Sequence, residues 1–296
     1  LSENSQQILD EKLMGYNSII QADELLQKLN DSNWVIIDCS FSLAKPELGR
    51  KNYLERHIPG AFYAHLGEDL SGPIIAGKTS RHPLPPIEDF VEKLSNWGID
   101  KESQVIVYDD AGGMVAGRLW WMIQWLGHEN VALLNGGIQE WEKKYFPTND
   151  QLPNFSREEF NPNVQRNRLV EVEELEKLRE SPHHLLVDSR ASERYSGKEE
   201  NLDHTAGHIP GAVNLHFQGN LDENGLFLNK ELLKKRFSEI HKELAIENTI
   251  YYCGSGVSAN HNLIAIKYAG FGNAKLYAGS WSEWITDEKR PIATEE

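Results

Sequence analysis

The sequence is poor in cysteine and in basic residues, and it has no long apolar run. Its 296 residues include only two cysteines, Cys39 and Cys253, so a disulfide framework is excluded and no metal site is expected. Acidic residues outnumber basic ones by 45 to 30, which gives a formal net charge of -15. This excess argues against nucleic acid and anionic membrane surfaces as partners, because phosphate binding needs clustered Lys and Arg.

The apolar segments are short as well, and none approaches the roughly 18 residues that a membrane-spanning helix needs. The N-terminal stretch LSENSQQILDEK shows no basic region followed by an apolar one, so no signal peptide is expected. Together with the two cysteines, this predicts a cytoplasmic protein. Apolar residues make up 40% of the chain, enough for real cores, and the length suits two domains of about 150 residues.

The chain contains an internal repeat. HIPGA occurs at His57 and again at His208, and an apolar run that ends in Asp precedes each copy. Further along, VIVYDDAGG in the first half matches TIYYCGSGV in the second, which sets Asp109 opposite Cys253. LLNGGIQEW and LYAGSWSEW follow in the same order. Matched blocks in one order and at nearly constant spacing indicate two copies of one fold.

Each copy shows short apolar strands alternating with helices, the pattern of an α/β fold with a mainly parallel sheet flanked by helices. Residues 1–146 are predicted to form the first domain and residues 169–296 the second. The polar, proline-containing stretch 147–168 is the predicted linker. Cys253 then falls just past the C-terminal end of a strand, where open α/β sheets bind their ligands.

The loop CGSGVSA, which begins at Cys253, has the features that stabilise a thiolate. A free thiol has a pKa of about 8.5 and is mostly protonated at neutral pH. Gly254 and Gly256 let backbone N–H groups converge as an anion nest, and the following helix directs its N-terminus to the same point. The loop therefore predicts a nucleophilic cysteine, with a buried packing cysteine as the alternative. Cys39 is interpreted as a packing residue.

Taken with the HIPGA repeat and GSWSEW, this loop resembles that of the tandem-domain rhodanese family of sulfurtransferases, and the resemblance covers nearly the whole chain. CGSGVSA is most similar to the CGSGVTA loop of 3-mercaptopyruvate sulfurtransferases, with Ser258 in place of Thr. It lacks the basic residues of the CRKGVTA type found in thiosulfate-specific rhodaneses. The resemblance implies two tandem rhodanese-like domains, the first of them catalytically silent because Asp109 replaces the nucleophile, and it implies no cofactor.

The family further implies a cycle in which Cys253 takes a sulfur atom from a small anionic donor as a persulfide. A thiol acceptor, such as thioredoxin or a small thiol, or cyanide then removes it. Ser255 would assist through a hydrogen-bond relay. The family also places a histidine of the N-terminal half at the interface between the domains, and RHPLP supplies His82 at that position. The acidic partner of His82 matches Gly67, with Glu68 and Asp69 adjacent, and Asp69 is the residue chosen. The remaining loop residues expected to contact the substrate are Gly254, Gly256, Val257 and Ser258.

The family pattern also places two arginines against the donor carboxylate. The first maps onto Arg194, whose planar fork could bind a carboxylate bidentately. The second falls near Asn201, which departs from the pattern, and Arg190 is interpreted as structural.

The expected donor is 3-mercaptopyruvate, because the loop offers no cationic side chain to hold dianionic thiosulfate. A thiosulfate sulfurtransferase and a non-catalytic persulfide carrier are the alternatives. A cysteine phosphatase is disfavoured because Ala259 stands at the position of the arginine that would bind phosphate.

Overall fold

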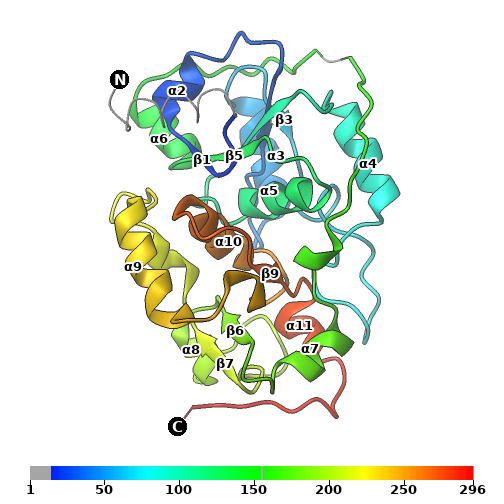
Figure 1. Ribbon diagram of the computed structural model, residues 1–296. Helices are drawn as coiled ribbons and strands as arrows, with labels where there is room; N and C mark the ends of the chain where they lie inside the picture. The colour runs from blue at the N-terminus through cyan, green and yellow to red at the C-terminus, as the bar shows by residue number, and fades with distance from the viewer. Residues whose placement is uncertain (1–14, 155, 296) are drawn as a thin grey trace. The chain divides into compact units, whose positions relative to one another are not determined.

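The computed structural model describes residues 15–154 and 156–295, and these form two compact units (Figure 1). One unit contains the described residues up to His65 together with Glu88–Asn163. The other contains Leu66–Ile87 and the chain from Val164 onward. The segment Leu66–Ile87 therefore packs with the second half of the chain, although the sequence places it well inside the first copy of the repeat.

The first unit is built on a parallel five-stranded sheet with the order β1-β5-β4-β2-β3. Its central strand has the sequence QVIVY and is buried along its whole length, as expected for a strand covered on both faces. The strands are β1 (Ile19–Ile20), β2 (Trp34–Asp38), β3 (Phe62–Tyr63), β4 (Gln104–Tyr108) and β5 (Val131–Leu134). The α-helices are α2 (Ala22–Leu26), α3 (Glu47–Glu55), α4 (Ile87–Asn96), α5 (Ala116–Trp125) and α6 (Gly137–Lys143).

The second unit repeats this plan with a parallel four-stranded sheet in the order β7-β6-β8-β9. Its strands are β6 (Leu185–Asp188), β7 (Ala212–Asn214), β8 (Thr249–Tyr252) and β9 (Lys275–Leu276). The α-helices are α7 (Val172–Leu178), α8 (Ser192–Ser196), α9 (Lys230–His241), α10 (Ala259–Tyr268) and α11 (Ser280–Trp284). Short 3-10 helices are η1 (Arg166–Arg168), η2 (Phe217–Asn220) and η3 (Ile246–Asn248). The expected α/β class with parallel sheets flanked by helices is confirmed.

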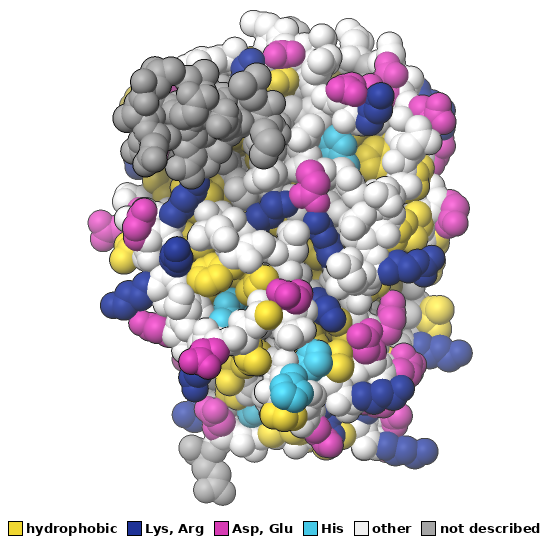
Figure 2. All heavy atoms as spheres, viewed as in Figure 1, with side chains coloured by type: hydrophobic (Ala, Val, Ile, Leu, Met, Phe, Trp, Pro, Cys, Tyr) yellow, Lys and Arg dark blue, Asp and Glu magenta, His cyan; other side chains and the backbone are white. Residues whose placement is uncertain are grey.

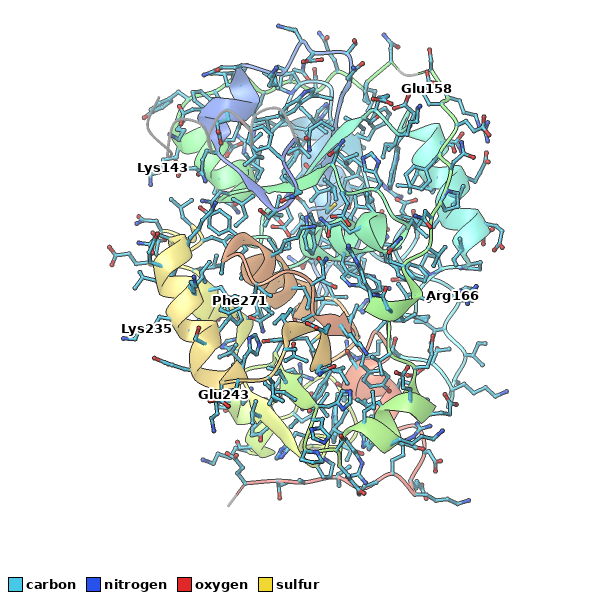
Figure 3. The ribbon with its side chains drawn as sticks, in the orientation of Figure 1. Lys143, Glu158, Arg166, Lys235, Glu243 and Phe271 are labelled. Atoms are coloured by element: carbon cyan, nitrogen blue, oxygen red, sulfur yellow. The ribbon has the colours of Figure 1, made fainter. Side chains whose placement is uncertain are left out.

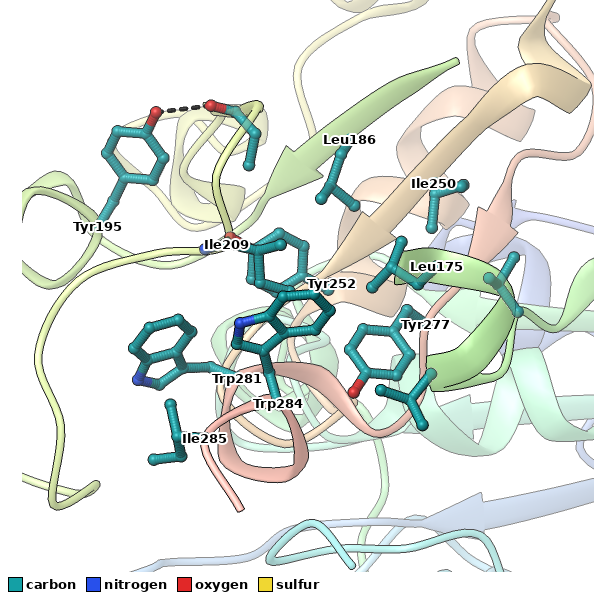
Figure 4. Packing of buried hydrophobic residues seen from close by; sticks show 13 residues of the cluster. Leu175, Leu186, Tyr195, Ile209, Ile250, Tyr252, Tyr277, Trp281, Trp284 and Ile285 are labelled. Carbon is teal, nitrogen blue, oxygen red and sulfur yellow. Dashed lines mark hydrogen bonds between the residues drawn. The ribbon is translucent and has the colours of Figure 1, made fainter. Parts of the chain in front are cut away.

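The core of the second unit joins its sheet to α11 (Figure 4). Trp281 and Trp284 from that helix are fully buried against Tyr252, which ends β8, and Tyr277. The indole N–H of Trp284 donates to the Pro291 carbonyl at 2.9 Å. In the first unit Trp141 is also fully buried, and its N–H donates to a proline carbonyl at 2.8 Å. The tryptophans of the repeat are therefore core residues in both units.

The two HIPGA blocks are structural as well. His57 and His208 are both buried, and each ring hydrogen-bonds through Nδ1 to the carbonyl of a tyrosine, Tyr53 at 2.6 Å and Tyr195 at 2.8 Å. Each histidine also stacks on the ring of the same tyrosine. The repeated motif thus fixes a buried turn, and it carries none of the candidate site residues.

The outer surface follows ordinary amphipathic patterning. On α9, Lys235 lies on the exposed face while Leu233 and Phe237 are buried (Figure 3). Acidic and basic side chains are interspersed over the face that Figure 2 draws. Among the described residues, no helix is long and apolar enough to cross a membrane.

Candidate active site

Cys253 lies at the C-terminal end of β8, between that strand and the first residue of α10. The thiol is buried, with 1% of the residue exposed. Its sulfur accepts a hydrogen bond from the Ser258 hydroxyl and from the backbone N–H groups of Ser255, Val257 and Ala259. Four donors therefore converge on one sulfur atom, and the last of them belongs to the first turn of a helix, where the macrodipole also favours an anion.

This arrangement decides the protonation of the thiol. Burial acts to raise the pKa of Cys253, because it removes water from the thiolate. The hydrogen bonds from Ser258 and from the three N–H groups outweigh burial, so the pKa of Cys253 lies below its ordinary value. A low-pKa thiolate is the form that acts as a nucleophile.

The two loop glycines are required for different reasons. Gly256 has φ +76°, and a side chain there would overlap the backbone of Ala278. Gly254 has no positive φ, but a methyl group built on it would lie 2.9 Å from Nη2 of Arg81. Gly256 therefore shapes the loop, and Gly254 makes room for a cation.

Ser280, the first residue of α11, is a part of the site that was not identified from the sequence. It has φ +57°, an unusual conformation for a residue with a side chain, which costs on the order of 1 kcal/mol. Its hydroxyl accepts the Cys253 N–H at 3.1 Å and lies 4.0 Å from the sulfur. At the matched position the first unit has Gly137 with φ +56°. A serine in place of a glycine between two copies of a repeat is the signal that could have revealed it.

The structure brings His82 and Ser255 together in the second unit, whereas the sequence pattern assigned His82 to the N-terminal domain. His82 Nδ1 lies 2.8 Å from the Ser255 hydroxyl. Both residues belong to the second unit, because His82 is part of the segment Leu66–Ile87. Asp69 is half-buried in a turn at the start of the same segment. Its partnership with His82 stays a prediction.

Arg194 lies beside the loop, but its fork is already occupied. Its Nε and Nη2 atoms bind the Glu200 carboxylate at 2.8 to 3.0 Å, and Nη2 also binds Asp203 at 3.0 Å. Burial acts to raise the pKa of Glu200, but the hydrogen bonds and charge of Arg194, together with the N–H groups of Leu202 and Asp203, outweigh burial and hold that pKa below its ordinary value. The fork that the sequence suggested for a donor carboxylate is therefore engaged by Glu200 and Asp203, and the part of Arg194 in binding the donor stays a prediction.

Arg190 has the structural contacts expected of it. Its guanidinium binds Asp188 at 2.6 Å, with both side chains essentially unexposed, and it lies 4.9 Å from the ring centre of Trp281. Burial acts to lower the pKa of Arg190, but the charge and hydrogen bonds of Asp188, together with Tyr252 and Glu200, outweigh burial and raise it. Asn201, where the family pattern has its second arginine, is exposed.

The matching loop of the first unit has Asp109 in the place of Cys253 and the same kind of nest of backbone N–H groups. Asp109 is fully buried, and its carboxylate accepts N–H groups two, four and six residues further on, from Ala111, Gly113 and Val115, at 2.8 to 2.9 Å. Ala116 donates a fourth bond at 2.8 Å. The three donors to Cys253 stand at the same spacings. The same backbone nest thus holds the carboxyl group of Asp109 in one unit and a sulfur atom in the other.

Comparison with known proteins agrees with this geometry. The profile of the rhodanese-like domain family matches residues 21–144 and 171–287. The chain belongs to the rhodanese-like domain family. It is 40% identical over 282 residues to a protein of Pseudomonas aeruginosa named probable 3-mercaptopyruvate sulfurtransferase, covering 95% of this chain and 99% of that protein. It is 33% identical over 257 residues to thiosulfate sulfurtransferase of Rattus norvegicus, covering 84% of each.

Solved rhodanese-like structures show the same fold. A 3-mercaptopyruvate sulfurtransferase from Leishmania major superposes with a TM-score of 0.81 and 27% identity, covering 93% of this chain and 75% of the other. A 3-mercaptopyruvate sulfotransferase from Escherichia coli gives a TM-score of 0.77 and 28% identity, covering 90% and 100%. The expected family, fold and enzyme class, a sulfurtransferase, are confirmed.

Proposed function

We propose that the protein transfers the sulfur of 3-mercaptopyruvate through a persulfide on Cys253 to a thiol acceptor. The observation that carries this proposal is the convergence of the Ser258 hydroxyl and three N–H groups on the buried Cys253 sulfur. Such a cradle favours a thiolate before the reaction and an anionic persulfide after it. Relatives named 3-mercaptopyruvate sulfurtransferase support the choice of donor.

In the first step the Cys253 thiolate attacks the donor sulfur. A sulfur–sulfur bond forms, the carbon–sulfur bond of the donor breaks, and its electron pair stays on carbon as the enolate of pyruvate. The enolate then takes up a proton. Ser255, held 2.8 Å from His82, is the proposed relay for that proton, with Asp69 as the proposed partner of His82.

In the second step a thiol attacks the outer sulfur of the persulfide and carries it away, which restores the Cys253 thiolate. Thioredoxin or a small thiol would serve as acceptor, and cyanide would serve in an assay. Both cysteines are free, and a reducing compartment such as the cytoplasm would keep Cys253 available between cycles. In this proposal the first unit is catalytically silent, since Asp109 cannot form a persulfide.

Thiosulfate is the second candidate donor, and one observation favours it. Guanidinium groups of Arg81 and Arg194 lie beside Gly254, so the loop has cationic neighbours even though it carries none itself. These charges are balanced, however, because Asp203 and Glu200 pair with them. A site with no net charge favours a donor with one carboxylate over a compact dianion.

The test is a comparison of kcat/KM for the two donors with cyanide as common acceptor, at fixed pH and ionic strength. We expect the larger value for 3-mercaptopyruvate. A larger value for thiosulfate would contradict the proposed donor while leaving the sulfurtransferase class in place.

A further inference from the structure

Arg81 lies against the Cys253 loop in a place that the sequence did not suggest. It precedes His82 in the segment Leu66–Ile87, and its Nη2 atom lies 2.9 Å from a methyl group built on Gly254. Nη1 of Arg194 lies 3.4 Å from the same point. Gly254 directly follows Cys253, so two guanidinium groups from distant parts of the sequence flank the residue next to the nucleophile.

Both guanidiniums are held in place by a shared acid. Arg81 binds Asp203 through Nε at 2.9 Å and through Nη2 at 3.2 Å, and Arg194 binds the same carboxylate at 3.0 Å. The Asp203 side chain is only 3% exposed, whereas those of Arg81 and Arg194 are 29% and 20% exposed. The acid is thus buried, and part of each arginine side chain remains exposed.

The backbone of Arg81 is fixed to the loop as well. Its N–H donates to the Ser282 hydroxyl at 3.2 Å, and the Ser282 N–H donates to the Gly254 carbonyl at 2.9 Å. A single residue of α11 therefore ties Arg81 to the residue after the nucleophile. This degree of positioning exceeds what a surface ion pair needs.

We propose that Arg81 is a specificity-determining residue that binds the anionic group of the sulfur donor together with Arg194. This inference rests on the proposed function, and it assigns to Arg81 the part that the family pattern gives to an arginine near position 201, where this chain has Asn201. Asp203 acts as the positioning residue that sets the two guanidiniums side by side.

The experiment compares wild type, Arg81→Ala and a control variant on two donors that differ only in the anionic group. One donor is 3-mercaptopyruvate, and the other is mercaptoacetone, in which a methyl group replaces the carboxylate. The control is Arg157→Ala, which breaks an ion pair of 2.7 Å with Glu92 in the other unit. Cyanide is the acceptor throughout, and KM and kcat are determined separately.

For Arg81→Ala we expect kcat/KM for 3-mercaptopyruvate to fall roughly ten- to a hundred-fold, mainly through KM, because a charge-assisted hydrogen bond is lost. The value for mercaptoacetone should stay within about two-fold of wild type, since that donor has no carboxylate to lose a partner. Inhibition by pyruvate should weaken in parallel with the loss on 3-mercaptopyruvate. Arg157→Ala should match wild type on both donors.

An equal loss on both donors would show that Arg81 only supports the loop, and no loss on either would remove it from the site. Either result overturns the inference. If wild type used thiosulfate and not 3-mercaptopyruvate, the proposed donor would be wrong. The same variants, compared on thiosulfate and mercaptoacetone, would still decide whether Arg81 binds the anionic group.

Discussion

Replacing Ser258 with alanine should raise the pKa of Cys253 and thereby lower the reactivity of the enzyme near neutral pH. Among the groups that stabilise the thiolate, the Ser258 hydroxyl makes the largest contribution, ahead of the three N–H groups. A hydrogen bond to a charged group is worth about 1.5–3 kcal/mol, and 1.36 kcal/mol corresponds to one pKa unit. Ser258 is half-buried, so water can partly replace its hydroxyl, and we expect a rise of about one unit.

The assay is the rate of alkylation of Cys253 by iodoacetamide as a function of pH, in a Cys39→Ser background. Only the thiolate reacts, so the rate falls as the pH drops through the pKa of Cys253. Because this pKa is lowered in the wild type, the wild type should stay reactive to a lower pH than Ser258→Ala. Below both pKa values the variant should react about ten-fold more slowly. The acid limb of kcat/KM should move in the same direction.

Two matched variants separate the hydroxyl from the loop itself. Ser258→Thr keeps a hydroxyl and should keep the low pKa of Cys253. Ser255→Ala removes a neighbouring hydroxyl but keeps the N–H that binds the sulfur, so it should leave the pKa unchanged while slowing turnover. If Ser258→Ala left the pKa of Cys253 unchanged, or if Ser255→Ala raised it by the same amount, the role assigned to the Ser258 hydroxyl would be refuted.

Further outcomes follow from the same contacts. Cys253→Ser should abolish sulfur transfer, and mass spectrometry should find one extra sulfur atom on the Cys253 peptide of the wild type only; normal turnover in the variant would exclude Cys253 as nucleophile. Asp109→Ala should lower the free energy of unfolding by about 3–5 kcal/mol in a denaturant titration, since three buried N–H groups and one partly buried N–H group lose their acceptor; an unchanged value would show that the nest does not need an acceptor. Burial raises the pKa of Asp38 to about 6. Above that pH the buried carboxylate is charged and lowers the free energy of unfolding, and this loss of stability disappears as the pH falls and the group is protonated. Asp38→Asn should therefore raise the free energy of unfolding by about 1–3 kcal/mol at pH 7 and by little at pH 4. Asp188→Asn, which breaks the buried ion pair with Arg190, should instead lower the free energy of unfolding by about 3–5 kcal/mol. Calorimetry in which Asp38→Asn and Asp188→Asn changed the stability in the same direction would contradict this contrast.

The sequence predicts those features of the fold and of the site that depend on residues close together in the chain. The repeat, the parallel sheets and the loop after Cys253 all follow from short apolar runs, from glycine positions and from a matched order of motifs. Asp109 was recognised as the counterpart of Cys253 because the flanking strands align. Each of these inferences needs only residues close together in the chain.

The features that were missed depend on packing between distant segments. The resemblance brings His82 to the site, but it does not indicate that the neighbouring Arg81 lies beside Gly254 and pairs with Asp203. The fork of Arg194 was expected to be open, but Glu200 and Asp203 occupy it. A motif can show that an arginine, and with it a positive charge, belongs to the site. The hydrogen-bond partners of that arginine, which the motif does not show, decide which of its N–H groups can reach a substrate.

The two nests also separate what the backbone supplies from what the side chains supply. Gly112 and Gly256 stand three residues after Asp109 and Cys253, and both have a positive φ, at 66° and 76°. The same N–H spacings follow, so the backbone supplies the same three donors in both units, and in the second unit the Ser258 hydroxyl adds a fourth. In the first unit the nest binds the carboxyl group of Asp109, and we expect these hydrogen bonds to contribute stability. In the second unit the nest lowers the pKa of Cys253, and in the proposed reaction it would also hold the persulfide. The proposed reaction also needs a route for a proton and a site for the charge of the donor. We propose that the segment Leu66–Ile87 supplies both, because it carries His82 and Arg81 beside the loop.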